Sequence, residues 1–273
     1  MKISEFSMNK FIILGLILSA GLLSCNRFEY SPNQIFDRNS PTDINAKSLQ
    51  QLGDGKTDDH IRFILTGDTQ RSRDETVAFV KKVNDMPGID FVLVAGDFTE
   101  FGVLKEMEWI ARSLSKLNVP YMGVIGNHDL TSRGREVFER MFGALNYSFS
   151  YGGTKFICHD TNSREYNFNG QVPSIPWLKT QLQPEEGITN YVAVSHVPTI
   201  NSDFDQNLVK DYTGIFAETP GFLASLHAHT HVYDLYYPDD SGIPYVITSA
   251  MGNEEFLLVE IINHKISFER ISF

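Results

Sequence analysis

The sequence has little cysteine and few basic residues. Its 273 residues include two cysteines, which excludes a disulfide framework and any multi-cysteine zinc or iron–sulfur site. Lysine and arginine total 23 against 34 aspartates and glutamates, a formal net charge of −11. This acidic balance argues against a nucleic-acid-binding protein, which needs a basic surface to neutralise phosphates. The 42% of hydrophobic residues and the length suit one large α/β domain or two small ones.

A long apolar run lies near the N-terminus, at residues 11–23, after Lys2 and Lys10. Its 13 residues match the core of a signal peptide and are few for a membrane-spanning helix. The run ends in Leu-Leu-Ser-Cys at residues 22–25, which resembles a bacterial lipobox. The resemblance implies cleavage before Cys25 and lipid modification of Cys25, and the alternative is an ordinary secretory signal that ends near a cysteine. We therefore expect an exported lipoprotein of the cell envelope, facing the periplasm or the outer surface.

Three segments follow from this interpretation. Residues 1–24 are the predicted signal peptide, and the polar residues 25–60 are a predicted lipid-anchored tether. Residues 61–273 form the predicted domain. Cys158 lies in an apolar run of this domain, which predicts a buried strand and an unreactive thiol.

Short apolar runs and helical patterns alternate from residue 61 onward. Runs at residues 61–65, 91–95 and 121–125 predict the strands of a parallel sheet that is covered on both faces. Ligands of such sheets bind beyond the carboxyl ends of the strands. Each run is followed there by glycine and a residue that can bind metal, namely Asp68, Asp97 and Asn127. One such pair is usually a turn or a helix cap, but three, spaced 29 and 30 residues apart, predict a common site.

The second half of the sequence adds imidazoles at strand ends. His196 follows the apolar run 191–195, and three alternate histidines, His227, His229 and His231, follow the run 221–226. Alternate residues of an extended segment face the same side. Carboxylates, an amide and imidazoles together suit divalent cations of intermediate hardness. Because these ligands are too many for one ion, we expect two ions that share a carboxylate.

The order of these motifs resembles the calcineurin-like metallophosphoesterase superfamily, from about residue 61 to the C-terminus. The motifs are Gly67-Asp68-Thr69-Gln70, Gly96-Asp97-Phe98-Thr99-Glu100, Gly126-Asn127-His128-Asp129, Ser195-His196-Val197-Pro198 and Ala228-His229-Thr230-His231. The resemblance implies an α/β fold of four layers, an αββα sandwich in which two mixed sheets are flanked by helices. It also implies a dinuclear metal centre between the sheets.

The resemblance assigns a role to each residue of these motifs. It implies that one metal ion binds Asp68, Asp97 and His231, and that Asp97 bridges to a second ion. The coordination of the second ion is completed by Asn127, His196 and His229. It further implies that His128 is the general acid near the leaving group, oriented by Asp129.

Two positions depart from the family pattern. Gln70 stands where the family usually has histidine, and its carbonyl oxygen is a weaker ligand than imidazole. We therefore expect looser binding of the first metal ion, or a water in place of the ligand. Ala228 replaces the usual glycine, which crowds the turn but removes no ligand. The additional His227 is expected to support the site or to face the sheet rather than to bind metal.

The expected activity is metal-dependent hydrolysis of phosphomonoesters or phosphodiesters, with a metal-bridging hydroxide as nucleophile. Mn²⁺ is the first expectation for the two ions, with Fe, Zn, Mg or Ca as alternatives. Asn127 and Arg71 are candidate contacts for the substrate phosphate. The alternative function is an envelope-anchored metal-containing binding protein with weak or no catalysis, against which the retained His128 argues. A lactamase-like hydrolase is excluded because its His-x-His-x-Asp-His motif is absent.

Overall fold

The computed structural model describes residues 32–55 and 60–273. The chain divides into two compact units, Met1–Phe36 and Asp37–Phe273. The described part of the first unit includes a short 3₁₀ helix, η1 (Pro32–Gln34). The predicted signal peptide and Cys25 lie outside the described residues. Among the residues that are described, no helix has the length and apolar character needed to cross a membrane.

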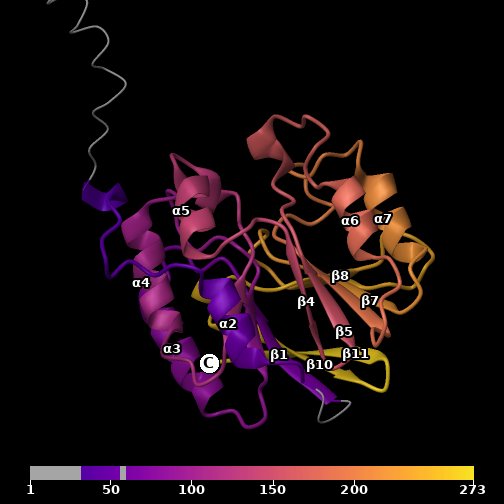
Figure 1. Cartoon of the computed structure of the whole chain (residues 1–273), viewed down its shortest axis with the longest axis horizontal. Coiled ribbons are helices and arrows are strands. Elements are labelled where there is room, and N and C mark those ends of the chain that lie inside the picture. The colour runs from indigo at the N-terminus through magenta and orange to yellow at the C-terminus, as the bar shows by residue number, and fades with distance from the viewer. Residues whose placement is uncertain (1–31, 56–59) are drawn as a thin grey trace, which may run out of the picture. The chain divides into compact units, whose positions relative to one another are not determined.

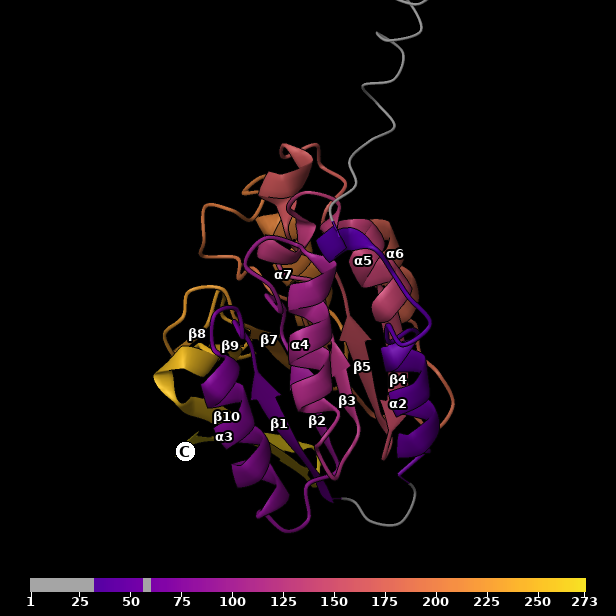
Figure 2. The ribbon, with the colours of Figure 1, turned by 90° about the vertical axis from the view of Figure 1, so that its left-hand side faces the viewer.

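Two mixed β-sheets form the centre of the larger unit (Figures 1 and 2). The first sheet has the order β11-β10-β1-β2-β3, with β1 parallel to β2 and antiparallel to β10. Its strands are β1 (His60–Thr66), β2 (Phe91–Val94), β3 (Tyr121–Gly123), β10 (Glu255–Ile262) and β11 (Lys265–Ser272). The second sheet has the order β4-β5-β6-β7-β9-β8 and is parallel from β5 to β9. Its strands are β4 (Tyr147–Tyr151), β5 (Thr154–Cys158), β6 (Asn190–Val194), β7 (Phe222–His227), β8 (Asp234–Tyr236) and β9 (Tyr245–Ile247).

The two sheets face each other across an apolar core. Phe63 of β1 and Phe91 of β2 each meet Phe156 of β5 edge to face, with ring centroids 5.4 and 5.3 Å apart. Strands of both sheets contribute to this single cluster of buried side chains. The continuous apolar runs of the sequence are therefore strands buried on both faces, as predicted.

Helices cover the outer faces of the sheets (Figure 1). The helices are α2 (Ile44–Leu52), α3 (Arg73–Asn84), α4 (Leu104–Leu114), α5 (Gly134–Met141), α6 (Ile175–Gln181) and α7 (Val209–Ala217). On the first sheet, Phe79 of α3 packs edge to face on Phe256 of β10. On the second sheet, Phe216 of α7 stacks on Phe222 of β7, with centroids 4.2 Å apart. The four-layer arrangement with two mixed sheets confirms the predicted fold class.

Part of the predicted tether is folded. Residues 37–55 belong to the larger unit, and α2 within them lies beside β3 at the edge of the first sheet. The Asn45 side chain makes two hydrogen bonds to Gly123, because its Nδ2 donates to the carbonyl and its Oδ1 accepts from the amide. Asn45 thus occupies edge groups that a further strand would otherwise bind. The compact unit begins at Asp37 rather than at the predicted residue 61.

Cys158 ends β5 and is fully buried. Burial raises the pKa of its thiol to about 12, so the thiolate is scarce at neutral pH. The predicted buried strand is confirmed, and its burial agrees with an unreactive thiol.

Candidate metal centre

Strand ends of both sheets meet where the sequence predicts the site. Asp68 follows β1 and Asp97 follows β2. The amide of Asp68 donates to the carbonyl of Gly96, the residue before Asp97, and this hydrogen bond joins the two strand ends. On the second sheet, the amide of Ala228 donates to the carbonyl of His196, which joins the ends of β6 and β7. Parallel strands thus deliver side chains that are distant in sequence to one edge.

The backbone at the site adopts conformations that most residues avoid. Four predicted ligands have left-handed backbone angles, with φ of 50° at Asp68, 56° at Asp97, 75° at His229 and 66° at His231. Such angles cost free energy and persist where the surrounding structure enforces them, commonly at functional sites. Gly126 shows the local constraint, because a Cβ there would lie 2.1 Å from Oδ1 of Asp97. Position 126 therefore requires glycine, because the carboxylate of Asp97 occupies the space of a side chain.

Hydrogen-bond acceptors converge around His196. Its Nδ1 lies 2.7 Å from the carbonyl oxygen of Ala95, so this nitrogen carries the hydrogen. Its Nε2 lies 3.0 Å from Oδ1 of Asn127, 3.2 Å from Oδ2 of Asp97 and 3.2 Å from Nδ1 of His229. The Nδ1 of His229 is also 3.0 Å from the same Asn127 oxygen. Four lone-pair atoms facing one another require a shared proton or a cation between them, and this donor set fits a divalent metal ion.

The other half of the site contains Asp68, Gln70 and His231. Oδ2 of Asp68 accepts from the amide of His229, while Oδ1 is buried without a hydrogen-bond partner in the described part of the chain. Oε1 of Gln70 is likewise buried and unpaired there. The Nε2 of His231 lies 3.5 Å from Oδ1 of Asp68 and 3.3 Å from Nε2 of Gln70. Unpaired buried oxygens are costly, and a cation at this place would bind them both.

The pKa values of the site reflect the same crowding. Burial raises the pKa of Asp68 to about 7, with the charge of Asp97 acting in the same direction. Burial opposes the charged form of His196, but the adjacent Asp97 outweighs it and raises the pKa of His196 to about 9. Burial and the nearby His196 lower the pKa of His229 to about 4. The raised pKa values of Asp68 and His196 favour protons on these groups, and a bound cation would compete with those protons.

His128 lies at the mouth of the cluster, and its partner differs from the prediction. Its Nδ1 is 3.0 Å from the carbonyl oxygen of Glu100, whereas the predicted orienting residue was Asp129. The carboxylate of Asp129 instead accepts from the backbone amides of Phe98, Thr99 and Gly126. Asp129 therefore links the loops that follow β2 and β3. It makes no direct hydrogen bond to His128.

Three further predictions concern residues beside the cluster. The side chain of Arg71 is 74% exposed and forms an ion pair with Glu100. The imidazole of His227 is buried between Ser195 and Ser225, at 3.0 and 2.9 Å, apart from the proposed ligand cluster. Ala228 is fully buried, and its methyl occupies space beside Gly67, where a Cβ would lie 2.7 Å away. The substitution of glycine by Ala228 therefore displaces no predicted ligand.

The sequence analysis missed two charged residues near the cluster. Oδ2 of Asp203 lies 3.6 Å from Nε2 of His229. Nη1 of Arg164 lies 3.2 and 3.1 Å from the two oxygens of the same carboxylate. Arg164 lies in the short 3₁₀ helix η3 (Ser163–Tyr166) and Asp203 lies in a loop. Nothing in the local sequence of either residue distinguishes it from a solvated charge.

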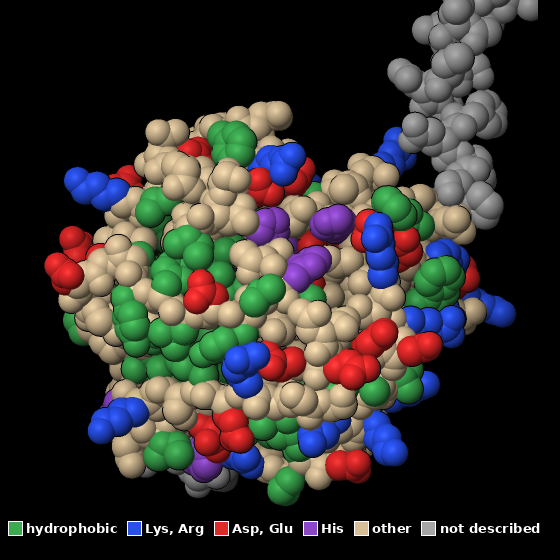
Figure 3. Space-filling model, turned by 180° about the vertical axis from the view of Figure 1, so that it is seen from behind, with side chains coloured by type: hydrophobic (Ala, Val, Ile, Leu, Met, Phe, Trp, Pro, Cys, Tyr) green, Lys and Arg blue, Asp and Glu red, His purple; other side chains and the backbone are tan. Residues whose placement is uncertain are grey.

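The cluster reaches the surface. The side chains of His128 and His231 are 36% and 52% exposed, whereas that of His196 is buried. A group of histidines lies on one face of the molecule, with acidic and basic side chains beside them (Figure 3). A soluble ester can therefore approach the cluster from solvent.

Comparisons with known proteins agree with this geometry. The calcineurin-like phosphoesterase family model matches residues 61–233. The chain belongs to this family. As a calcineurin-like phosphoesterase it is a phosphoester hydrolase, and the family implies divalent metal ions.

Individual relatives are distant. The phosphoesterase is 22% identical over 187 residues to a 3′,5′-cyclic-nucleotide phosphodiesterase of Nostoc sp., covering 64% of this chain and 69% of that protein. A dimetal phosphatase of Danio rerio superposes with a TM-score of 0.64 at 14% identity, over 78% of this chain and 96% of that one. A purple acid phosphatase from yellow lupin (Lupinus luteus) seeds gives a TM-score of 0.60 at 14% identity, over 81% of this chain and 52% of that one. At these identities the two structures establish a shared fold.

Proposed function

We propose that this calcineurin-like phosphoesterase hydrolyses phosphomonoesters or phosphodiesters at a dinuclear metal centre, with His128 as general acid. The observation that carries the proposal is the convergence of Asp97, Asn127, His196 and His229 on one point, beside the unpaired oxygen of Asp68. In this proposal, Asp97 would contribute its carboxylate to both ions. His231 and Gln70 would complete the coordination of the ion on the side of Asp68.

The metal ions would neutralise charge on the phosphate and lower the pKa of water, so that hydroxide is available near neutral pH. Mn²⁺ is the first candidate, and Fe, Zn, Mg or Ca are alternatives. The oxygen of Asn127 faces the imidazoles, and its Nδ2, which has no hydrogen bond to the residues that the structure describes, would donate to a phosphate oxygen. Arg71 lies on the rim of the site and remains a candidate phosphate contact.

His128 is positioned for proton transfer through its second nitrogen. Because Nδ1 donates to the carbonyl of Glu100, a proton on Nε2 is the one available to the departing alkoxide. Burial opposes the charged form, but the Glu100 carbonyl and the charge of Asp97 raise the pKa of His128. The pKa of His128 is thus shifted in the direction that a general acid requires.

Turnover of chromogenic esters tests the proposal. We expect the purified protein loaded with Mn²⁺ to hydrolyse 4-nitrophenyl phosphate or bis(4-nitrophenyl) phosphate. Asp97→Asn should abolish turnover and lower metal content, whereas Asp239→Asn, at an exposed turn, should do neither. Two bound ions without turnover of any ester would instead support the alternative, a metal-containing binding protein. A cyclic nucleotide belongs in the panel because of the Nostoc relative.

We also propose export and membrane anchoring through Cys25. The support is the lipobox-like sequence at residues 22–25 after the apolar run. In a bacterial host, labelled palmitate should appear on the wild-type chain and be absent from Cys25→Ala. Equal labelling of both chains, or none in either, would contradict lipidation at this residue.

A further inference from the structure

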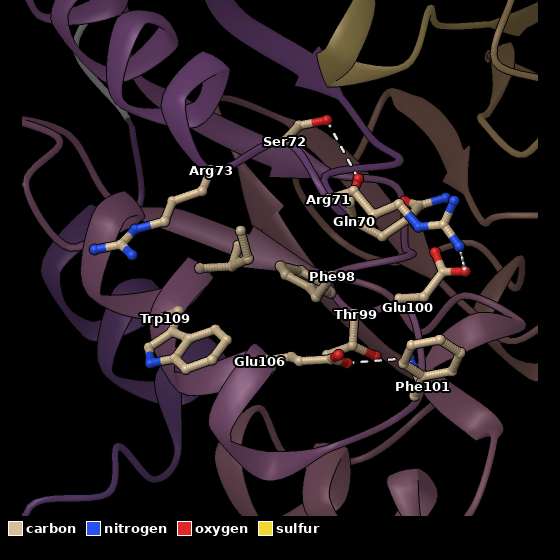
Figure 4. Close-up of a pocket in the computed structure, with 11 residues that line it drawn as sticks. Gln70, Arg71, Ser72, Arg73, Phe98, Thr99, Glu100, Phe101, Glu106 and Trp109 are labelled. Atoms are coloured by element: carbon tan, nitrogen blue, oxygen red, sulfur yellow. Dashed lines mark hydrogen bonds and ion pairs between the residues drawn. The ribbon is translucent and has the colours of Figure 1, made fainter.

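A cavity of 260 Å³ lies beside the proposed metal centre (Figure 4). Its lining includes Gln70 and Arg73 from the segment after β1, Phe98, Glu100 and Phe101 from the loop after β2, and Trp109 from α4. In Figure 4, Glu100 lies at one end of the cavity, and Arg73 and Trp109 lie at the other. The lining thus extends from Glu100, which contacts His128, to Trp109 of α4.

The cavity borders the proposed site through two of its lining residues, Glu100 and Gln70. The carbonyl of Glu100 holds Nδ1 of His128, and Glu100 also lines the cavity. Gln70, another lining residue, lies 3.3 Å from His231. A leaving group directed towards Glu100 and Gln70 would therefore reach this cavity.

Three aromatic side chains and one isoleucine form the apolar part of the lining. Phe98 is fully buried and Ile110 nearly so, and they form an apolar inner surface. Phe101 and Trp109 are 57% and 53% exposed, although large aromatic side chains usually bury most of their surface. Two exposed rings around one small cavity are suited to packing against the faces or edges of another ring.

Two cationic side chains line the cavity, and one of them has no ion pair with the residues that the structure describes. Arg71 forms an ion pair with Glu100, and Glu106 accepts a hydrogen bond from the amide of Phe101. Arg73 is exposed and has no ion pair with any residue that the structure describes. A guanidinium beside an aromatic surface favours an anionic or hydrogen-bond-accepting substituent on a bound ring.

We propose that this cavity binds an aromatic ring in the leaving group of the substrate, and that Arg73 binds an acceptor or negative charge on the ring. This inference rests on the proposed function. In the reaction, oxygen from water forms a new bond to phosphorus and the bond from phosphorus to the alcohol oxygen breaks. That oxygen takes a proton and leaves with the ring. The enzyme would therefore prefer esters of ring-bearing alcohols.

Two esters with equivalent leaving oxygens separate ring recognition from chemistry. We compare kcat/KM for 3-phenylpropyl phosphate and 3-cyclohexylpropyl phosphate, since each ratio is measured on one preparation and is independent of the folded fraction. The wild type should prefer the phenyl ester by about three- to tenfold. Trp109→Leu and Phe101→Leu should reduce this ratio towards one. Phe168→Leu, an exposed aromatic residue outside the cavity, should retain the wild-type ratio.

A carboxylate on the ring tests the role of Arg73. The wild type should prefer 3-(4-carboxyphenyl)propyl phosphate to the unsubstituted phenyl ester, and Arg73→Gln should remove this preference. Lys81→Gln, which alters an exposed cation of the same helix α3, is the matched control and should keep it. An unchanged preference in Arg73→Gln would overturn the assignment of this residue.

Binding can also be observed without turnover. In Trp177→Phe, Trp109 is the only tryptophan, so its fluorescence reports on the cavity. We expect 3-phenylpropylphosphonate, which cannot be hydrolysed, to change this fluorescence saturably. Hydrolysis with a ratio near one, unaffected by Trp109→Leu, would overturn the ring site and leave the proposed function intact. Saturable binding without hydrolysis of any ester would overturn the proposed function and support the ring site.

Discussion

The carboxylate of Asp203 lies 3.6 Å from Nε2 of His229, while Nδ1 of the same imidazole faces Asn127 and His196. A carboxylate beside one ring nitrogen favours a hydrogen on that nitrogen and leaves the lone pair of the other for a cation. Arg164 holds both oxygens of Asp203 and so limits how the carboxylate can move. Asp203 is therefore placed to favour the tautomer of His229 that metal binding at Nδ1 would require.

Asp203→Asn should weaken binding of the ion that His229 contacts by about 10- to 100-fold, because the amide no longer favours the required tautomer. Calorimetric titration of metal-stripped protein with Mn²⁺ measures the loss. Asp211→Asn, an exposed carboxylate at the start of α7, should bind like the wild type. Equal affinities for all three proteins would show that Asp203 has no influence on the metal.

His128→Asn should lower kcat/KM for an alkyl phosphate by about 10²–10⁴-fold, because the alkoxide then leaves without a proton. The loss should be much smaller with 4-nitrophenyl phosphate, whose phenolate leaves readily as an anion. Metal content should not change, and His264→Asn, at the exposed turn after β10, should behave as the wild type. An equal loss on both esters would contradict a role in leaving-group protonation.

Asn45→Ala should destabilise the protein by about 1–3 kcal/mol, because it leaves the amide and carbonyl of Gly123 without their side-chain partner. Urea denaturation monitored by circular dichroism measures the change. Gln51→Ala, an exposed residue of the same helix, should have little effect. If residues 37–55 acted only as a tether, both variants would match the wild type.

The apolar runs of the sequence predicted β1, β2, β3, β6 and β7, and the ligand candidates follow the ends of these strands. Buried parallel strands leave continuous apolar runs, and residues such as Asp97 or His196 directly after such a run are conspicuous. The left-handed backbone at Asp68 and His229 could not be predicted, because neither residue type requires it. That conformation is imposed by packing between strands, as the lack of space at Gly126 illustrates.

Features that depend on long-range pairing also escaped prediction. Helix α2 lies in a polar segment, and Asn45 acts through Gly123, which is 78 residues away. Asp203 meets a histidine of another loop, and Glu100 rather than the neighbouring Asp129 holds His128. Local sequence carries no information on such pairs, since a carboxylate or an amide in a loop is most often solvated.

Gln70→His should tighten the weaker of two metal-binding steps by about tenfold, because imidazole is a better ligand than an amide oxygen for metals of this class. In the wild type, the two steps should differ in affinity, since Gln70 contributes on the side of Asp68 and His231. Gln206→His, in the loop before α7, controls for an added histidine. Two equally tight steps in the wild type would contradict the weak contribution of Gln70.

His159→Gln should reduce the dependence of stability on pH. The imidazole of His159 is buried and lies 2.9 Å from the hydroxyl of Tyr212, and burial lowers its pKa to about 4. An unfolded histidine titrates near 6.5, so between these values the unfolded state binds the extra proton and stability falls as the pH falls. From pH 7.5 to pH 5 this residue should cost the wild type about 2 kcal/mol. Urea unfolding of metal-stripped protein should therefore show a smaller loss in His159→Gln, while His264→Gln should retain the full loss.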